Sequence, residues 1–217
     1  MRQRKAKDLD RRLSECSELM TVPAGENEDF KYFDNGGELY LEIGCGKGNF
    51  IIRKALDNPL KNFIAIEGQE TVILRALEKA KASKPVDGDM ILNLKFMMSF
   101  VDNMNDFFEE NQLSGIYLNF SDPWPKARHA KRRLTYRKRL EDYGWAVKPG
   151  GFIEIKTDND ALYEFTLEEI AAVGYEISEQ SRDLHSSGFD SKNTTTEYEE
   201  KFKKNGKNIN YVKVLIK

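Results

Sequence analysis

Three glycines at alternate positions stand where an apolar segment gives way to an amphipathic one. In LYLEIGCGKGNF, Gly44, Gly46 and Gly48 end a predicted strand and lead into a predicted helix. Glycines let a backbone pass close to a bound molecule, and the amides at a helix start face such a molecule. The spacing is G-x-G-x-G rather than the G-x-G-x-x-G of dinucleotide loops, and Glu42 precedes the first glycine by two residues. The segment predicts a loop for a ligand with a cationic group.

A second acid, Glu67, ends the next predicted strand, nineteen residues after Gly48. A carboxylate there can accept both hydroxyls of an adenosine ribose. For either motif alone, a tight turn with a solvated acid is a plausible alternative, but the two together favour a ligand. An adenosine with a cationic amino-acid end is S-adenosylmethionine. A nicotinamide-dependent oxidoreductase would also use Glu67, but the glycine spacing and the absence of a plausible hydride-site His or Tyr-Lys pair disfavour it.

A lone acid stands at the edge of a basic strip. In SDPWPKARHAKRRLTYRKR, Asp122 adjoins a Pro-Trp-Pro segment, and Lys126 to Arg139 contain eight Lys and Arg and no acid. The whole chain has a formal charge of -2, so this strip is typical of a protein that binds one polyanion at one place. The prolines restrict the backbone beside the acid. An isolated charged run is more often a solvated helix face, but its position beside Asp122 favours phosphate binding.

Apolar periodicity alternates between strands and helices along the chain, which predicts an α/β fold with a parallel sheet and helices on both faces. Strands are expected at 38–44, 62–68, 90–97, 114–122, 151–158, 175–181 and 209–217, and helices at 48–58, 70–83, 101–111, 135–147 and 160–174. KPGG, residues 148–151, predicts a turn. A basic extension at 1–37 would precede one domain at 38–217.

These motifs resemble known families. LEIGCGKG followed by AIEG, and the later VKPGG, resemble Rossmann-like class I S-adenosylmethionine-dependent methyltransferases. NFSDPWPKARHAKRRL, IKTDN and TTTEYEEKF are similar to the tRNA (guanine-N7-)-methyltransferase family, and the likeness runs from Glu38 onward. The resemblance implies a mostly parallel central sheet with an antiparallel last strand. It also implies methyl transfer to N7 of a variable-loop guanine, tRNA position 46.

The resemblance further implies a role for each matching residue. The cofactor would contact Glu42, Gly44, Gly46, Gly48, Glu67 and Asp122, and Asp122 would be the catalytic acid. The substrate would contact Lys126, Asp158, Thr196, Glu197, Tyr198 and Glu199. The RNA would lie against Arg128, His129, Lys131, Arg132 and Arg133. Charge alone, rather than the resemblance, suggests a second contact at the basic residues Arg2, Arg4, Lys5, Lys7, Arg11 and Arg12.

Two positions leave alternatives open. Asp158 precedes a predicted helix and could be its N-cap rather than a substrate ligand. Phe100 stands where the family has an acid near the adenine, and Asp102 follows two residues later. Either Phe100 stacks on or packs near the adenine while backbone groups read its edge, or the equivalent position is displaced along the chain.

Composition limits what can be expected of the protein's location and metal content. The sequence contains no apolar run of membrane-spanning length and no secretory signal, so a cytoplasmic protein is expected. Two cysteines and two histidines are too few and too scattered for a zinc site, and no metal is expected. The protein would be a monomer or homodimer. A non-catalytic RNA-binding module on the same fold is the alternative from another class, and the intact Glu42, Glu67 and Asp122 argue against it.

Overall fold

The computed structural model describes residues 6–23, 31–85, 88, 90–190, 193–196, 199 and 207–217. The chain divides into two compact units, one ending at Asp102 and the other beginning at Asn103. Among the helices in these ranges, none has the length and apolar character needed to span a membrane.

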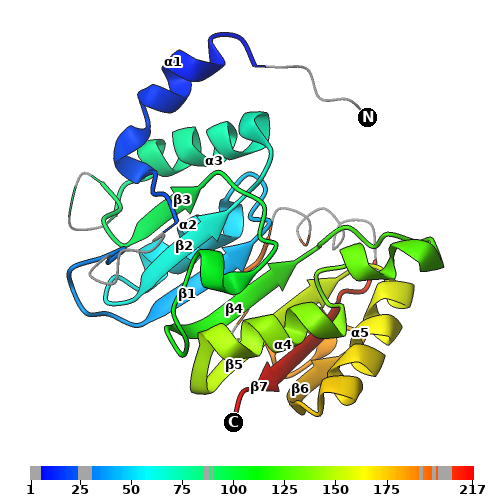
Figure 1. Ribbon diagram of the computed structural model, residues 1–217. Coiled ribbons are helices and arrows are strands. Elements are labelled where there is room, and N and C mark those ends of the chain that lie inside the picture. Colours follow the sequence, from blue (N-terminus) through cyan, green and yellow to red (C-terminus); the bar gives the residue numbers. More distant parts are fainter. Residues whose placement is uncertain are drawn as a thin grey trace. The chain divides into compact units, whose positions relative to one another are not determined.

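The first unit is built on three parallel strands in the order β3-β2-β1 (Figure 1). They are β1 (Leu39–Ile43), β2 (Asn62–Ile66) and β3 (Leu94–Met97). Every residue of β1 and β2 is buried, as expected for strands covered on both faces. Ile43 pairs with Ile66, and Ile66 pairs with Met97, so the carboxyl ends of the three strands lie side by side.

Helices α2 (Asn49–Asp57) and α3 (Glu70–Ala82) follow β1 and β2 and bury one apolar face each. Part of the basic extension also belongs to this unit. Helix α1 (Leu9–Ser14) contacts α3, where Arg12 forms an ion pair with Glu78 at 2.6 Å. After the turn η1 (Ser17–Leu19), Thr21 N–H donates to the Phe96 carbonyl beside β3 at 2.8 Å. The described part of the extension is therefore docked on the unit.

The second unit contains four strands in the order β4-β5-β7-β6. They are β4 (Leu113–Asn119), β5 (Val147–Thr157), β6 (Glu176–Ser181) and β7 (Asn210–Leu215). Strand β4 is parallel to β5, whereas β7 is antiparallel to both of its neighbours, which confirms the expected antiparallel last strand. Helices α4 (Arg137–Ala146) and α5 (Asp160–Val173) lie side by side against the strands (Figure 1).

Two expectations about local structure were wrong. The helix predicted at 101–111 is reduced to the short turn η2 (Met104–Asp106). There the Asp142 carboxylate accepts from Met104 N–H at 2.8 Å, and Phe107 and Phe108 are both buried, so tertiary contacts override the helical periodicity. The predicted turn KPGG lies inside β5, where the pairing with β4 shifts between Leu113 and Gly115 and accommodates the extra residues.

Candidate active site

The glycine loop leaves its backbone accessible between β1 and α2. Gly44, Gly46 and Gly48 all have positive φ, the conformation that favours glycine. The Ile66 carbonyl accepts from Gly44 N–H at 2.8 Å, which ties the loop to the end of β2. A Cβ on Gly44 or Gly46 would meet no atom within 4 Å, so the space beside the loop is open. The predicted ligand loop therefore has both the shape and the room for a ligand.

Glu67 is held in place directly after β2. Its Oε2 accepts from Gly46 N–H at 3.1 Å, and its Oε1 accepts from Gln69 N–H at 2.9 Å. Two backbone amides thus fix the carboxylate next to the glycine loop, and each oxygen retains a lone pair for a further donor. This orientation fits a carboxylate that receives the two hydroxyls of a ribose.

Glu42 lies within β1 and is 2% exposed. Burial raises the pKa of the neighbouring Cys45 thiol well above its ordinary value, and the nearby Glu42 and Glu67 carboxylates raise it further. The two acids therefore act on the same small region around the loop. One buried acid at the loop and one fixed acid beside it match the charge pattern of S-adenosylmethionine, which carries a cationic amino-acid end on an adenosine.

Phe100 follows β3 and is 72% exposed. Its ring lies against Gly68, because a Cβ on that glycine would be only 2.2 Å from the ring Cε1. Asp102 is also exposed, two residues further along. The ends of β2 and β3 thus carry a fixed acid and an exposed aromatic ring.

In the second unit, Asp122 follows β4 in a sharply turned loop. Phe120 (φ 52°) and Trp124 (φ 40°) have left-handed backbone conformations, which are uncommon for residues other than glycine. Asp122 is exposed and has no hydrogen bond or ion pair with the residues that the structure describes. The loop therefore presents a carboxylate to its surroundings from a constrained backbone.

Arg133 braces this loop, a role that sequence reasoning missed. Its Nε donates to the Pro123 carbonyl and its Nη2 to the Trp124 carbonyl, both at 3.0 Å. The guanidinium carbon also lies 4.2 Å from the ring centre of Phe165 on α5. The run of Lys and Arg gave no signal that one member turns inward, because the contact arises only when the chain folds back through η3 (Ala127–Arg132).

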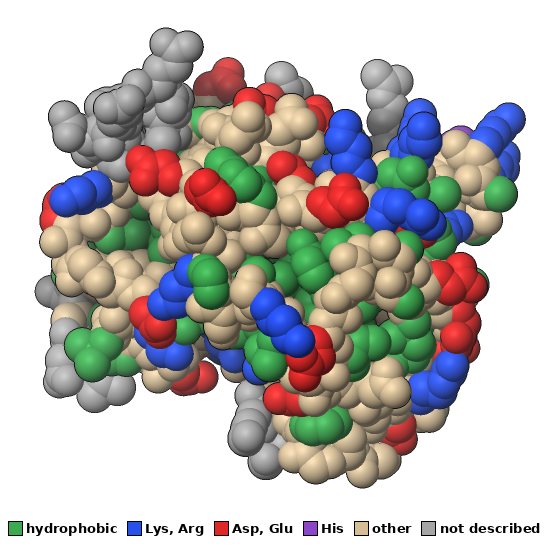
Figure 2. Space-filling model, turned by 60° about the horizontal axis from the view of Figure 1, so that its bottom comes forward, with side chains coloured by type: hydrophobic (Ala, Val, Ile, Leu, Met, Phe, Trp, Pro, Cys, Tyr) green, Lys and Arg blue, Asp and Glu red, His purple; other side chains and the backbone are tan. Residues whose placement is uncertain are grey.

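The remaining strip is largely exposed. Figure 2 shows Lys and Arg side chains gathered at the right of the view, the side on which Figure 1 places η3. The Arg132 guanidinium lies 5.0 Å from the Trp124 ring, and His129 meets that ring edge-on. Four exposed members form no side-chain hydrogen bond, ion pair or ring contact with the described residues: Lys126, Arg128, Lys131 and Lys138. At the end of the strip, hydrogen bonds from Arg137 lower the pKa of the buried Glu169 carboxyl on α5.

Asp158 follows β5, which is the strand next to β4. It is half-buried and is not the N-cap of α5, so that alternative was wrong. The cap is Asn159, whose Oδ1 accepts from Leu162 N–H at 2.8 Å. Because Asn119 pairs with Lys156, Asp122 and Asp158 leave neighbouring strands at the same edge of the unit.

Thr196 and Glu199 are buried, whereas Glu197 and Tyr198 lie outside the described residues. The Glu199 carboxylate accepts from Thr196 N–H at 2.7 Å and from Asn193 Nδ2 at 2.8 Å. It also lies 3.5 Å from the Lys156 ammonium of β5, and both side chains of this ion pair are almost fully buried. The pair ties the segment around Thr196 to the edge from which Asp158 projects.

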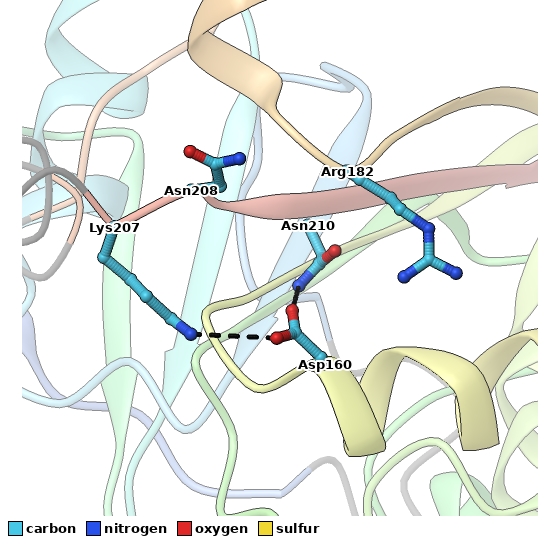
Figure 3. A pocket seen from close by; sticks show the side chains of 5 residues that line it. All are labelled: Asp160, Arg182, Lys207, Asn208 and Asn210. Atoms are coloured by element: carbon cyan, nitrogen blue, oxygen red, sulfur yellow. Dashed lines mark hydrogen bonds and ion pairs between the residues drawn. The ribbon is translucent and has the colours of Figure 1, made fainter.

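A polar pocket of about 450 Å³ opens beside the start of α5 (Figure 3). It is lined by Asp160, Arg182, Lys207, Asn208 and Asn210. Asn210 donates to Asp160 at 2.8 Å, Lys207 lies 3.8 Å from the same carboxylate, and Arg182 pairs with Glu164. Each cation is matched by an acid, so the pocket lacks the excess positive charge of an anion site. The described residues also contain no cluster of three His, Cys, Asp or Glu that could hold a metal.

Comparisons with known proteins agree with these features. Residues 37–212 match the model of a family described as "Putative methyltransferase". A tRNA (guanine-N(7)-)-methyltransferase of Mesoplasma florum is 49% identical over 181 residues, covering 82% of this chain and 80% of that protein. One from Clostridioides difficile is 41% identical over 212 residues, covering 96% of each.

Solved structures with low sequence identity share the fold. The 16S rRNA methyltransferase KamB is 10% identical with a TM-score of 0.59, and the match covers 99% of this chain and 96% of that one. An antibiotic-related methyltransferase is 16% identical with a TM-score of 0.57, covering 98% and 95%. These likenesses confirm the Rossmann-like methyltransferase fold.

Proposed function

Because the chain belongs to the tRNA (guanine-N7-)-methyltransferase family, we propose that it transfers a methyl group from S-adenosylmethionine to N7 of a guanine in tRNA. The target is the variable-loop guanine at tRNA position 46. The single observation that carries this assignment beyond the fold is the constrained loop in which Asp122 stands exposed at the head of a basic strip.

The first unit supplies the cofactor contacts. When bound, S-adenosylmethionine supplies a methyl group activated by a sulfonium. Glu67 receives the ribose hydroxyls, and the two amides that hold its carboxylate keep it oriented for them. Glu42 and the glycine loop accommodate the amino-acid end, where a buried acid attracts the cationic groups of the cofactor.

Asp122 acts on the guanine. N7 carries an in-plane lone pair and no proton, so it attacks a methyl group without a general base, and positioning dominates the acceleration. The ring gains positive charge as the methyl arrives. A carboxylate that accepts the guanine N–H groups orients the base and offsets that charge. Asp158, at the end of the adjacent strand, adds a second acceptor for the substrate.

The strip binds the phosphates of the tRNA through its exposed side chains, with Lys126, Arg128 and Lys131 as the members most available for this contact. Arg133 is a positioning residue for the loop of Asp122, because its Nε and Nη2 donate to the loop carbonyls. Glu199 is likewise a positioning residue, because its carboxylate is engaged by Lys156, Asn193 and Thr196.

N7 lies on the major-groove edge, which is deep and narrow in an RNA helix, so the target must be in a loop or leave its stack. A variable-loop guanine meets this condition. We expect the enzyme in the cytoplasm, where its tRNA substrate is found, and as a monomer or homodimer.

The test is incubation with methyl-labelled cofactor and unmodified total tRNA, followed by mapping of the modified nucleoside. The product should be 7-methylguanosine in the variable loop. Asp122→Asn should retain cofactor binding and most tRNA binding but lose methyl transfer by about 100-fold or more, because a preorganised charge is removed. A methyl group on an exocyclic amine, or near-normal single-turnover rates in Asp122→Asn, would refute the proposal.

A further inference from the structure

An aromatic ring stands exposed at the cofactor edge of the first unit. Phe100 is 72% exposed although it follows a strand whose apolar side chains, Leu94, Phe96 and Met97, are buried. Gly68 does not have a positive φ, so its backbone would accept a side chain. A Cβ there would nevertheless lie 2.2–2.5 Å from three carbons of the Phe100 ring. The absence of a side chain at Gly68 thus makes room for the ring.

The strand order fixes the direction in which a bound adenosine must extend. Glu67 stands at the end of β2, the middle strand, with the glycine loop after β1 on one side and Phe100 after β3 on the other. A ribose carries its amino-acid substituent and its base at opposite ends. With the amino-acid end at the glycine loop and the hydroxyls on Glu67, the base extends towards the end of β3.

We propose that Phe100 is the adenine platform of this enzyme: the base packs against its exposed ring, which is seated on Gly68. An aromatic ring binds a base by stacking and needs no hydrogen bond to do so. The backbone groups after β3 are then left to read the edge of the base. The assignment rests on the proposed function, since it takes S-adenosylmethionine as the ligand.

Calorimetric titration with S-adenosylhomocysteine tests the platform without any catalytic step. Phe100→Ala should raise the dissociation constant about 10-fold, which is within the usual range for a base on an aromatic ring. Phe100→Tyr should bind like the wild type. Leu92→Ala is the matched control, because Leu92 is 73% exposed at the other end of β3 and should have no effect. Stacking also lowers adenine absorbance near 260 nm, a change that Phe100→Ala should abolish at saturating ligand.

A double-mutant cycle adds a sharper readout. Gly68→Ala should weaken binding in the wild type because the new methyl group displaces the ring, and it should have little effect once Phe100 is Ala. Asp102→Ala tests the other alternative from the sequence, in which Asp102 is the displaced equivalent of the family's acid and its carboxylate binds the edge of the base.

The outcomes separate this inference from the proposed function. Wild-type affinity in Phe100→Ala, together with lost binding in Glu67→Ala or Asp102→Ala, would overturn the platform and leave the cofactor assignment standing. Failure of the wild-type protein to bind S-adenosylhomocysteine at all would overturn both.

Discussion

Replacement of Arg133 by Lys distinguishes a braced catalytic loop from a simple phosphate contact. Both side chains are cationic, so a phosphate of the tRNA would accept either. Only the planar guanidinium can donate to the Pro123 and Trp124 carbonyls in parallel while it packs on Phe165. The substitution therefore keeps the charge of the strip and removes the brace.

The size of the effect follows from these contacts. A hydrogen bond from a charged group contributes about 1.5–3 kcal/mol when buried, and the cation–aromatic contact adds about 0.5–1 kcal/mol. Arg133 is half-buried and a lysine can retain one of the two bonds, so about 2–3 kcal/mol is lost. If this energy holds Asp122 in place, the rate of methyl transfer should fall about 30- to 160-fold.

The assay is single-turnover methyl transfer at saturating tRNA and cofactor, with the tRNA dissociation constant measured in parallel. Arg133→Lys should lose rate and retain tRNA affinity and its salt dependence. Arg128→Lys is the control, because Arg128 is exposed in the same strip and its side chain forms no hydrogen bond or ion pair with the described residues. A near-normal rate in Arg133→Lys would refute the bracing role. A loss confined to tRNA affinity would also refute it and would indicate that Arg133 is an RNA contact.

Three further variants test other parts of the molecule. Glu67→Ala should weaken S-adenosylhomocysteine binding by about 1–3 kcal/mol, the cost of lost hydrogen bonds to a charged acceptor, and unchanged affinity in calorimetry would remove its ribose role. Replacing Arg128 and Lys131 with Glu should weaken tRNA binding and flatten its salt dependence while cofactor affinity stays constant; an unaltered slope would make them a solvated surface. Because Arg137 lowers the pKa of Glu169 in the folded state, that pair stabilises the fold above the ordinary carboxyl pKa and loses this contribution as pH falls through the lowered value. Glu169→Gln should therefore lower the unfolding temperature at pH 7 and have less effect at acid pH, and an equal effect at both would contradict the linkage.

Local periodicity predicted most of the fold because the strands of the first unit are short, apolar and buried on both faces. Periodicity failed where distant residues decide the conformation. Residues 101–111 carry a helical pattern, yet the Asp142 carboxylate holds Met104 N–H and two adjacent phenylalanines are buried in an irregular segment. Nothing in the extension predicted its docking either, because the Arg12–Glu78 ion pair joins positions 66 residues apart.

The residues of the candidate site also divide into those set by local sequence and those set by distant contacts. The glycine loop, Glu67 and the neighbourhood of Asp122 could be predicted, since each depends on residues close together in sequence. Arg133 was predicted to contact the RNA and Glu199 the substrate, because each belongs to a continuous motif, yet the structure turns both side chains inward. Lys156 was not singled out at all. Its partner Glu199 is 43 residues away, and a buried ion pair of this kind leaves no local pattern.

The contrast among the acids of the second unit supports the choice of Asp122 as the proposed catalytic acid. Glu169 and Glu199 are each engaged by a cation and a backbone amide. Asp122 stands next to the most basic segment of the chain and has no partner among the described residues, although ion pairing would be the ordinary outcome at such a place. The reason lies in the neighbouring arginines: Arg133 donates to backbone carbonyls and Arg132 lies over Trp124. Neither cation forms an ion pair with the Asp122 carboxylate. In the proposed function, its oxygens would therefore be available for guanine N–H donors, while the positive charge of the strip would attract the RNA.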